Sequence, residues 1–463
     1  HWPIRTQTSK PRFRRSETAL LLSPEPRIRL TPMPYPSISM GNQFRKALIG
    51  LTLVLASLQG SPSRAGPLQT WLQLPEWLDL SIDYTAEPMT GITGGINPSA
   101  ASWYQAVVLD LSLSSGFGKN QQQWSELDHW QVNLQLTNDA GNPDLNTELG
   151  SAFTLQTLVN PVGTWITEAS VVRNRGESWW QAELGVMSLD PVMAGEPGFL
   201  STPAMGSYIS SVLNNTLNLL IVGVPIDPFV APGVKLQAHS DSLGSLEYAY
   251  FYLNPQTSIA ASLGVDPGVP DVQGGVQALQ WKTNPLRSRT DLSAEISIPD
   301  TDESVIRQLP LPEVQLGGYF SSTRLLVDNA NELGEGINRG IYGSVTWPLD
   351  LPVGLDNRVW AGGTVSLDPS NNPYSTFISG GWLSQGIIPG RPLDVLALGL
   401  GRTSFSPTIN QGLSHEGTIE LNYSFYVSEI FQIQPVMQWI VNPGGEGKVP
   451  GIWAGGIQIN LSL

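Results

Sequence analysis

Cysteine is absent from the 463 residues, and charged residues make up only 14% of them. The first absence excludes disulfides and thiolate chemistry. A soluble domain carries about 25% charged residues, so the second indicates that much of the surface does not face water. Histidine is scarce, and no Gly-x-Ser-x-Gly or His-Glu-x-x-His motif is present. We therefore assign no catalytic residue, cofactor or metal site.

Long apolar runs are also missing. Ala47–Leu58 has 12 residues, whereas a membrane-spanning helix needs roughly 20. This run follows the basic pair Arg45–Lys46 and precedes the small residues of Ser63–Ala65. That order is typical of a secretory signal peptide. We expect 40–65 to be the signal peptide, with a buried helix or membrane anchor as the alternative.

Basic residues become rare once the signal peptide is set aside. Residues 1–39 are expected to be a non-native or disordered leader without function, and 66–463 the exported domain. That domain holds 37 acidic and 14 basic residues, a net charge of −23. Such a chain is a poor candidate for binding nucleic acid and repels anionic solutes.

The exported domain is rich in segments with two-residue alternation, separated by some of the 47 Gly and 37 Pro residues. Segments 418–427, 431–441 and 453–463 each place apolar residues on one face and amide or hydroxyl residues on the other. The same alternation recurs in 78–85, 130–137, 248–252 and 291–298. We count about sixteen or seventeen such segments, and barrels usually have an even number of strands. The sequence therefore predicts an all-β, transmembrane antiparallel β-barrel of about 16 strands.

Aromatic residues support a membrane location over a soluble sandwich. Trp347, Trp382, Tyr423, Trp439 and Trp453 lie near the ends of predicted strands, where interfacial aromatic belts are found. In a soluble sandwich the apolar faces would instead pack together as a core.

Two stretches interrupt the alternation. Residues 191–231 contain several Pro and Gly residues and a mixed apolar segment, 208–222. We expect a long loop with a short helix, folded into the lumen of the barrel. Residues 139–162 are expected to form a second such loop. The alternative for both is a solvated extracellular loop.

The C-terminal third resembles a known family. Gly380–Gly401, with its Gly-Ile-Ile-Pro-Gly-Arg-Pro-Leu-Asp turn, is similar to a strand, turn and next strand of the carbohydrate-selective porins of the OprB family. Glu420–Tyr423, Gln434–Pro435 and Asn442–Gly445 follow in the family's order. A weaker similarity reaches back to 184–190 and 232–235. In the resembling segment we expect Arg391 to have a structural role at a turn.

The resemblance implies a sixteen-stranded porin in the outer membrane of a Gram-negative-type bacterium, which admits glucose-like sugars by passive diffusion. The partners that it implies are small sugars as permeants, outer-membrane lipid and the barrel-assembly machinery, with a homotrimer as one candidate assembly. One departure is the final Leu463, because outer-membrane barrels commonly end in an aromatic residue used for assembly.

We expect inward-facing residues of three kinds to line the passage. Amides would bond sugar hydroxyls, charges would orient water across the pore, and a flat indole would contact the apolar face of a sugar. The candidates are the amides Gln131, Gln432 and Gln434, the charges Arg173, Glu183, Lys235, Glu247, Asp291, Glu295, Arg358 and Glu420, and the indoles Trp179 and Trp360. For each one the alternative is a generic wall residue.

Three other functions remain open. One is a general, weakly cation-preferring diffusion porin. Another is a secreted carbohydrate-binding all-β protein. A secreted glycosidase or barrel lipase is supported least, because nothing singles out a catalytic pair of carboxylates.

Overall fold

The computed structural model describes residues within 67–463. Its gaps are 76, 116–128, 143–144, 159–161, 177, 190–198, 200, 203, 205, 215–229, 254–273, 287–294, 300–302, 323–325, 328–330, 333–336 and 429. The expected leader and signal peptide lie outside the described residues, as does Asp291, so those assignments stay predictions.

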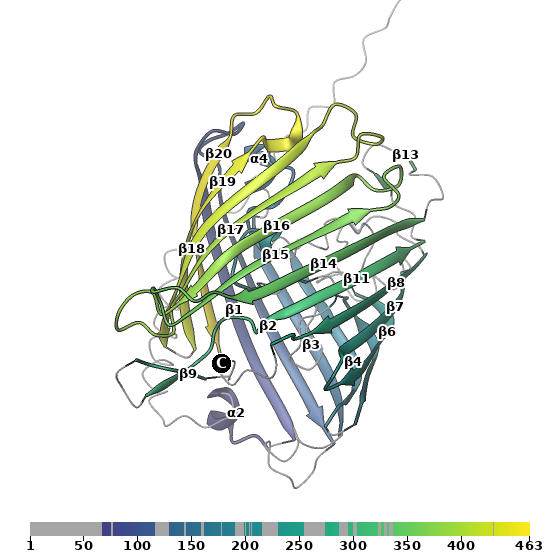
Figure 1. The fold of residues 1–463 in the computed structure, drawn as a ribbon, viewed down its shortest axis with the longest axis vertical. Coiled ribbons are helices and arrows are strands. Elements are labelled where there is room, and N and C mark those ends of the chain that lie inside the picture. The colour runs from purple at the N-terminus through teal and green to yellow at the C-terminus, as the bar shows by residue number, and fades with distance from the viewer. Residues whose placement is uncertain are drawn as a thin grey trace, which may run out of the picture. The chain divides into compact units, whose positions relative to one another are not determined.

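Sixteen antiparallel strands close into one barrel, in which β1 pairs with both β2 and β20 (Figure 1). They are β1 (Leu78–Thr93), β2 (Ala101–Ser114), β3 (His129–Gly141), β4 (Gly163–Asn174), β5 (Trp180–Met187), β6 (Ala231–Ser240), β7 (Gly244–Leu253), β8 (Gly274–Thr283), β11 (Glu313–Ser321), β14 (Asn338–Pro348), β15 (Asp356–Ser366), β16 (Tyr374–Gln385), β17 (Val395–Phe405), β18 (His415–Ser428), β19 (Phe431–Val441) and β20 (Ile452–Ser462). Closure leaves no unpaired edge, which is the condition for a sheet to lie in lipid. The predicted fold class is confirmed.

The alternation in the sequence becomes two different faces of the wall. On β7 the side chain of Glu247 is 3% exposed and points inward, whereas its neighbour Leu246 is 49% exposed and points outward. On β18, Thr418 and Glu420 are buried inside while Ile419 and Leu421 are exposed outside. Successive strand residues face opposite sides, so one face meets lipid and the other the lumen.

The two ends of the barrel differ. One end, here called the turn end, carries the start of β1, the end of β20 and mostly short connections such as 175–179 and 241–243, besides the longer connections 115–128 and 284–312. The other end, the loop end, carries the long connections 142–162, 188–230 and 254–273. In Figure 1 the chain end marked C and helix α2 (Pro67–Leu72) lie at the turn end. Outer-membrane barrels have short periplasmic turns and longer extracellular loops, so the turn end faces the periplasm.

Outward aromatic residues form a belt near each end, as the sequence predicted. The loop-end belt includes Trp103, Tyr250, Trp439 and Trp453, and the turn-end belt includes Trp130, Trp281, Trp347 and Phe425. Trp439 and Trp453 are paired across β19 and β20 and stack with their ring centroids 5.6 Å apart. Trp382 and Tyr423 also lie on outward faces near strand ends.

One predicted barrel strand is not in the barrel. Of the segment 291–298, the structure places Glu295–Ser297 (β9) in a two-stranded sheet with Ser304–Ile306 (β10). Three paired residues are too few to cross a membrane, which takes about nine to eleven. A second small sheet pairs β12 (Leu326–Val327) with β13 (Asn331–Glu332).

The helices within the described residues are short. They are α2, α4 (Leu145–Leu149), α5 (Ser211–Asn214) and the 3-10 turn η3 (Pro443–Gly445). No helix in the described part of the chain has the length and apolar character needed to cross a membrane.

Candidate functional site: the barrel interior

Two loop-end connections fold back against the inner wall. The first insert comprises 145–158 and begins with α4. Its backbone N–H groups at Ala152 and Phe153 donate to the carboxylate of Glu416 on β18, at 2.9 and 3.3 Å. Further along, the N–H of Leu158 donates to Glu87 on β1 at 3.0 Å. The expected inward position of this loop is thus observed.

The second insert comprises the described residues of 199–214 and ends with α5. The N–H groups of Ile209 and Ser210 donate to the two carboxylate oxygens of Glu420, at 2.8 and 2.7 Å. The side-chain amide of Gln434 donates to the carbonyl of Ser207 at 3.2 Å. This confirms the predicted lumenal loop, whose short helix is α5.

Apolar packing accompanies these polar anchors. At the loop end, inward residues such as Phe251, Phe377 and Phe405 cluster with Phe153 and Val212 of the inserts. The alternation of the C-terminal strands suggested an inner wall made of amides and hydroxyls throughout. These aromatic residues show that part of the inner wall is apolar instead. Burying such side chains contributes about 1.5–3 kcal/mol each, which helps to hold the inserts in place.

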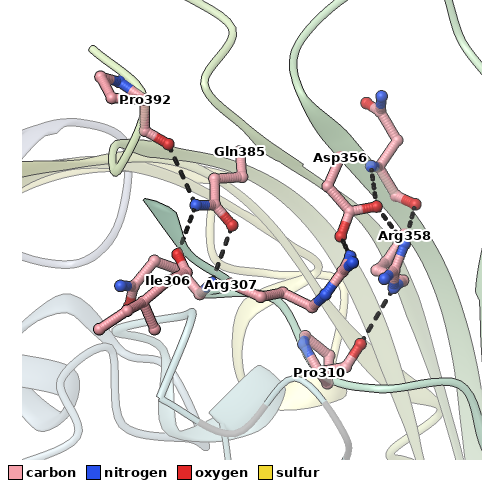
Figure 2. A network of polar contacts seen from close by, with 9 residues as sticks. Ile306, Arg307, Pro310, Asp356, Arg358, Gln385 and Pro392 are labelled. Carbon is pink, nitrogen blue, oxygen red and sulfur yellow. Dashed lines mark hydrogen bonds and ion pairs between the residues drawn. The ribbon is translucent and has the colours of Figure 1, made fainter. Parts of the chain in front are cut away.

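A third segment, the turn-end insert (303–312), enters from the opposite end. Figure 2 shows the polar network that fixes it: Asp356 pairs with both Arg307 and Arg358, and Arg358 Nε donates to the carbonyl of Pro310 at 3.0 Å. The amide of Gln385 donates to the carbonyl of Ile306 at 3.0 Å (Figure 2). The second and turn-end inserts therefore both lie against the inner wall.

These two inserts meet over β15–β17. Leu309 of the turn-end insert and Tyr208 of the second insert belong to one buried cluster with Trp360, Leu383 and Val395 of the wall. This side of the lumen is filled by side chains drawn from both ends of the barrel. Any inward surface that remains open must therefore lie on another part of the wall.

Inward exposure identifies that part. Away from the strand ends, inward side chains on β5–β8, β11 and β14–β18 are buried. On the turn-end halves of β1–β3 and β20, by contrast, the inward side chains remain partly exposed. This set, here called the open wall, includes Ser81, Asp83, Thr85, Asp110, Ser112, Gln131, Asn133, Gln135, Gln458 and Asn460, and Glu168 and Gln432 adjoin it.

Hydrogen bonds between neighbouring strands fix the open wall. The Gln135 amide donates to Asp110 at 2.6 Å, the Asn133 amide donates to Glu168 at 2.9 Å, and the Ser112 hydroxyl donates to Asn133 at 3.0 Å. Each of these groups has further donor or acceptor positions. The open wall is thus an ordered array of groups able to bond hydroxylated solutes.

The charges of the interior are unevenly distributed. Lys235 pairs with Glu183 at 3.5 Å and Lys282 pairs with Glu247 at 2.8 Å, all four side chains being buried. The open wall has carboxylates, among them Asp110, that form no ion pair within the described residues. A permeating solute therefore meets a wall of net negative charge.

The predicted lining residues differ in exposure and in the face of the wall on which they lie. Gln131 and Gln432 point inward and are partly exposed. Glu183, Lys235, Glu247, Arg358, Glu420, Gln434 and Trp360 point inward but are almost completely buried. Those seven side chains touch other wall residues or the inserts and present no free surface to a solute.

Three more candidates lie away from the interior. Arg173 is on the outward face of β4, with its guanidinium 3.8 Å from the ring centre of Trp180. A bulge in β4 shifts its alternation and moves this arginine to the outside. Trp179 is 68% exposed in the β4–β5 turn, and Glu295 is in the separate β9–β10 hairpin.

Sequence reasoning missed Glu87 and Glu416, which hold the first insert. The alternation places both on inward faces, but nothing in one sequence says that a loop will cover them. Arg391 has the expected position at a turn, because its guanidinium pairs with Asp394 at 2.7 Å and donates to the carbonyl of Tyr426 at 3.0 Å.

A closed sixteen-stranded barrel with an aromatic belt at each end and loops folded into its lumen is the architecture of outer-membrane porins. Residues 353–463 match the family model described as "Carbohydrate-selective porin, OprB family". This match agrees with the resemblance of the C-terminal motifs to that family, over 111 of the 463 residues.

A solved structure shares this fold. The high-pH structure of Pseudomonas putida OprB matches with a TM-score of 0.65 at 17% identity, covering 86% of this chain and 96% of that chain. Salmonella typhi OmpF in complex with daunomycin matches with a TM-score of 0.46 at 10% identity, covering 83% and 97%. No curated protein sequence matches the chain.

Proposed function

We propose that this protein is an outer-membrane porin through which small, neutral, glucose-like carbohydrates diffuse passively into the periplasm. The observation that supports it most is the open wall, where amides, hydroxyls and carboxylates are partly exposed inside the barrel. The family match of residues 353–463 supports the carbohydrate as the permeant.

The proposed mechanism has no chemical step. A sugar exchanges bonds to water for bonds to side chains such as Asn133, Gln135 and Gln458, whose spacing is fixed by the pleat of the strands. Such exchange costs little free energy in either direction, because each hydrogen bond nets only about 0.5–1.5 kcal/mol. Weak binding at several positions allows both entry and release.

The closest rival is a general, weakly cation-preferring diffusion porin. It is favoured by the unpaired carboxylates of the open wall, since these attract cations of any kind. Under either function we also expect contact with outer-membrane lipid, insertion by the barrel-assembly machinery and, as one candidate, a homotrimer.

Swelling of liposomes that contain the purified protein tests the choice. We expect glucose and maltose to enter faster than an amino acid of similar size. Rates that depend only on molecular size would instead identify a general porin. Replacing Asn133 by Leu should slow glucose and leave a small amino acid less affected, whereas replacing the outward-facing Leu134 by Ile should change neither rate.

A further inference from the structure

Among the described residues, five glutamates are buried and face inward, but they differ in their partners. Glu183 and Glu247 accept bonds from side chains of the wall itself: Lys235 contacts Glu183, while Gln237 and Lys282 contact Glu247. Such partners tie one strand to the next. They do not hold any connection in the lumen.

The other three glutamates bind backbone N–H groups of the inserts. Glu420 takes two of them, from Ile209 and Ser210, and uses its remaining acceptor positions for the amides of Asn422 and Gln438 at 2.7 and 3.0 Å. Four donors thus converge on one carboxylate that is fully buried. Charge-assisted bonds of this kind are about twice as strong as neutral ones.

Glu416 lies four residues earlier on the same face of β18. Besides Ala152 and Phe153, it accepts bonds from the Ser151 hydroxyl at 2.7 Å and from the N–H of Gly444 at 2.6 Å. Glu416 therefore joins the first insert to the β19–β20 loop.

Glu87 completes the set on β1. It accepts the N–H of Leu158, the hydroxyl of Thr157 and the amide of Gln458 at 2.6 Å. The backbone carbonyl of Glu87 also accepts the amide of Gln156 at 2.6 Å. The first insert is thus held at two places, at 151–153 by Glu416 and at 156–158 by Glu87.

The two inserts are also joined to each other. The hydroxyl of Ser211 donates to the carbonyl of Thr154 at 2.8 Å, and the two hydroxyl oxygens share a second hydrogen bond. The amide of Gln438 bridges them again, since it donates to the carbonyl of Leu155 at 2.7 Å and to Glu420. A displacement of one insert therefore disturbs the other.

We propose that Glu87, Glu416 and Glu420 are positioning residues that hold both inserts against β18–β20 and β1, and thereby set the size limit of the passage. The inference rests on the proposed function only in taking the barrel interior as the passage. These glutamates do not contact the solute; they fix how far the inserts extend towards the open wall.

The test compares E87Q, E416Q and E420Q with E183Q and E247Q, five isosteric changes at buried inward glutamates. Planar-bilayer conductance in KCl and exclusion of polyethylene glycols of graded size measure the aperture. We expect the first three variants to show higher or fluctuating conductance and to admit larger polymers. The two wall variants should keep the wild-type size limit.

Backbone hydrogen exchange measures directly how well the N–H groups of the inserts are held by the glutamates. In E420Q, amides of 207–214 should exchange roughly ten-fold faster or more, because a bond to a charged acceptor has been lost. In E416Q the increase should fall on 151–158. If E420Q fails to assemble, E420D takes its place, since it retracts both oxygens by one methylene.

Because the chain has no cysteine, a single disulfide can restore the arrangement. Cysteines at Thr154 and Ser211, whose oxygens are in hydrogen-bond contact, are placed to bridge the inserts. Oxidised T154C/S211C/E420Q should regain the wild-type size limit and lose it on reduction. Equal size limits and equal exchange in all five glutamate variants would overturn the proposal.

Sugar takes no part in these measurements. A wild-type protein that conducts ions but excludes sugars would defeat the proposed function and leave the role of the three glutamates standing.

Discussion

The hydroxyl of Tyr208 accepts a hydrogen bond from the indole N–H of Trp360 at 3.1 Å, and donates one to the carbonyl of Leu398 at 3.0 Å. Tyr208 belongs to the second insert and Trp360 to β15, and the centroids of their rings lie 5.8 Å apart. Trp360, which the sequence offered as a platform for sugar, is therefore buried against Tyr208.

Replacing Tyr208 by Phe should destabilise this region by about 1–3 kcal/mol, because the buried indole N–H loses its acceptor. The free energy of urea unfolding in detergent measures the change. Tyr250→Phe, at an exposed outward position, is the control and should be near neutral. An equal loss in both variants would contradict the assigned role of Tyr208.

Ion selectivity should follow the carboxylates of the open wall. Wild-type channels are expected to prefer cations, and Asp110→Asn should move the reversal potential in a salt gradient towards zero. The change keeps the shape of the side chain and an acceptor for Gln135. Glu168→Gln should act in the same direction. An unchanged reversal potential in both variants would show that the current does not pass this wall.

The position of the passage can be mapped by cysteine labelling in a chain that has none of its own. Ser112→Cys, on the open wall, should react quickly with a membrane-impermeant maleimide. Ser424→Cys is inward-facing but buried at 4% exposure, and should react slowly. The reverse order of rates would place the water-filled path along β18.

Asp356 should be costly to neutralise. It pairs with both Arg307 and Arg358 (Figure 2), and the exposed fraction of either arginine side chain is 6% or less. Breaking a buried pair by removing one partner costs about 3–5 kcal/mol. We expect Asp356→Asn to lower the unfolding free energy by a comparable amount and to expose 303–312 to protease. Full stability in this variant would refute the account of the turn-end insert.

Asp368 provides a test by pH at the loop end. The hydrogen bond from the Arg339 guanidinium holds the pKa of Asp368 below its ordinary value of 3.8. A carboxyl with a lowered folded pKa stabilises fully above its unfolded pKa, and this contribution is lost as pH falls through the folded pKa.

The stability difference between wild type and Asp368→Asn should accordingly be constant near neutral pH and disappear in strong acid. Its size should be at most about 1 kcal/mol, since Arg339 is half exposed. Urea unfolding at a series of pH values measures it. A difference that grew in acid would contradict the sign of the shift.

The barrel could be predicted because each of its strands carries a local pattern, the alternation of apolar and polar side chains. A strand that separates lipid from water must alternate, so 418–427 and 431–441 reveal both faces without any knowledge of their neighbours. The segment 291–298 alternates equally well yet forms only a three-residue strand outside the barrel. Alternation alone does not say which segments find partners.

The lining residues were harder to predict because they depend on the inserts. Glu420 and Gln131 both lie on inward faces, but a loop distant in the sequence covers the first and leaves the second partly open. Arg173 lies on the outward face instead of the expected inward one, because one bulge in β4 shifts the alternation of that strand. These contacts join residues far apart in the chain, and no local pattern encodes them.

The sequence positions of Glu87, Glu416 and Glu420 determine when each insert can be fixed to the wall during synthesis and folding. Ala152 and Glu416 are 264 residues apart, and Ser210 and Glu420 are 210 apart. Long-range contacts of this kind form late. Glu87 is made before the first insert, but Glu416 and Glu420 are made long after both inserts. A chain truncated before β18 would therefore lack two of the three carboxylates that hold the inserts in place.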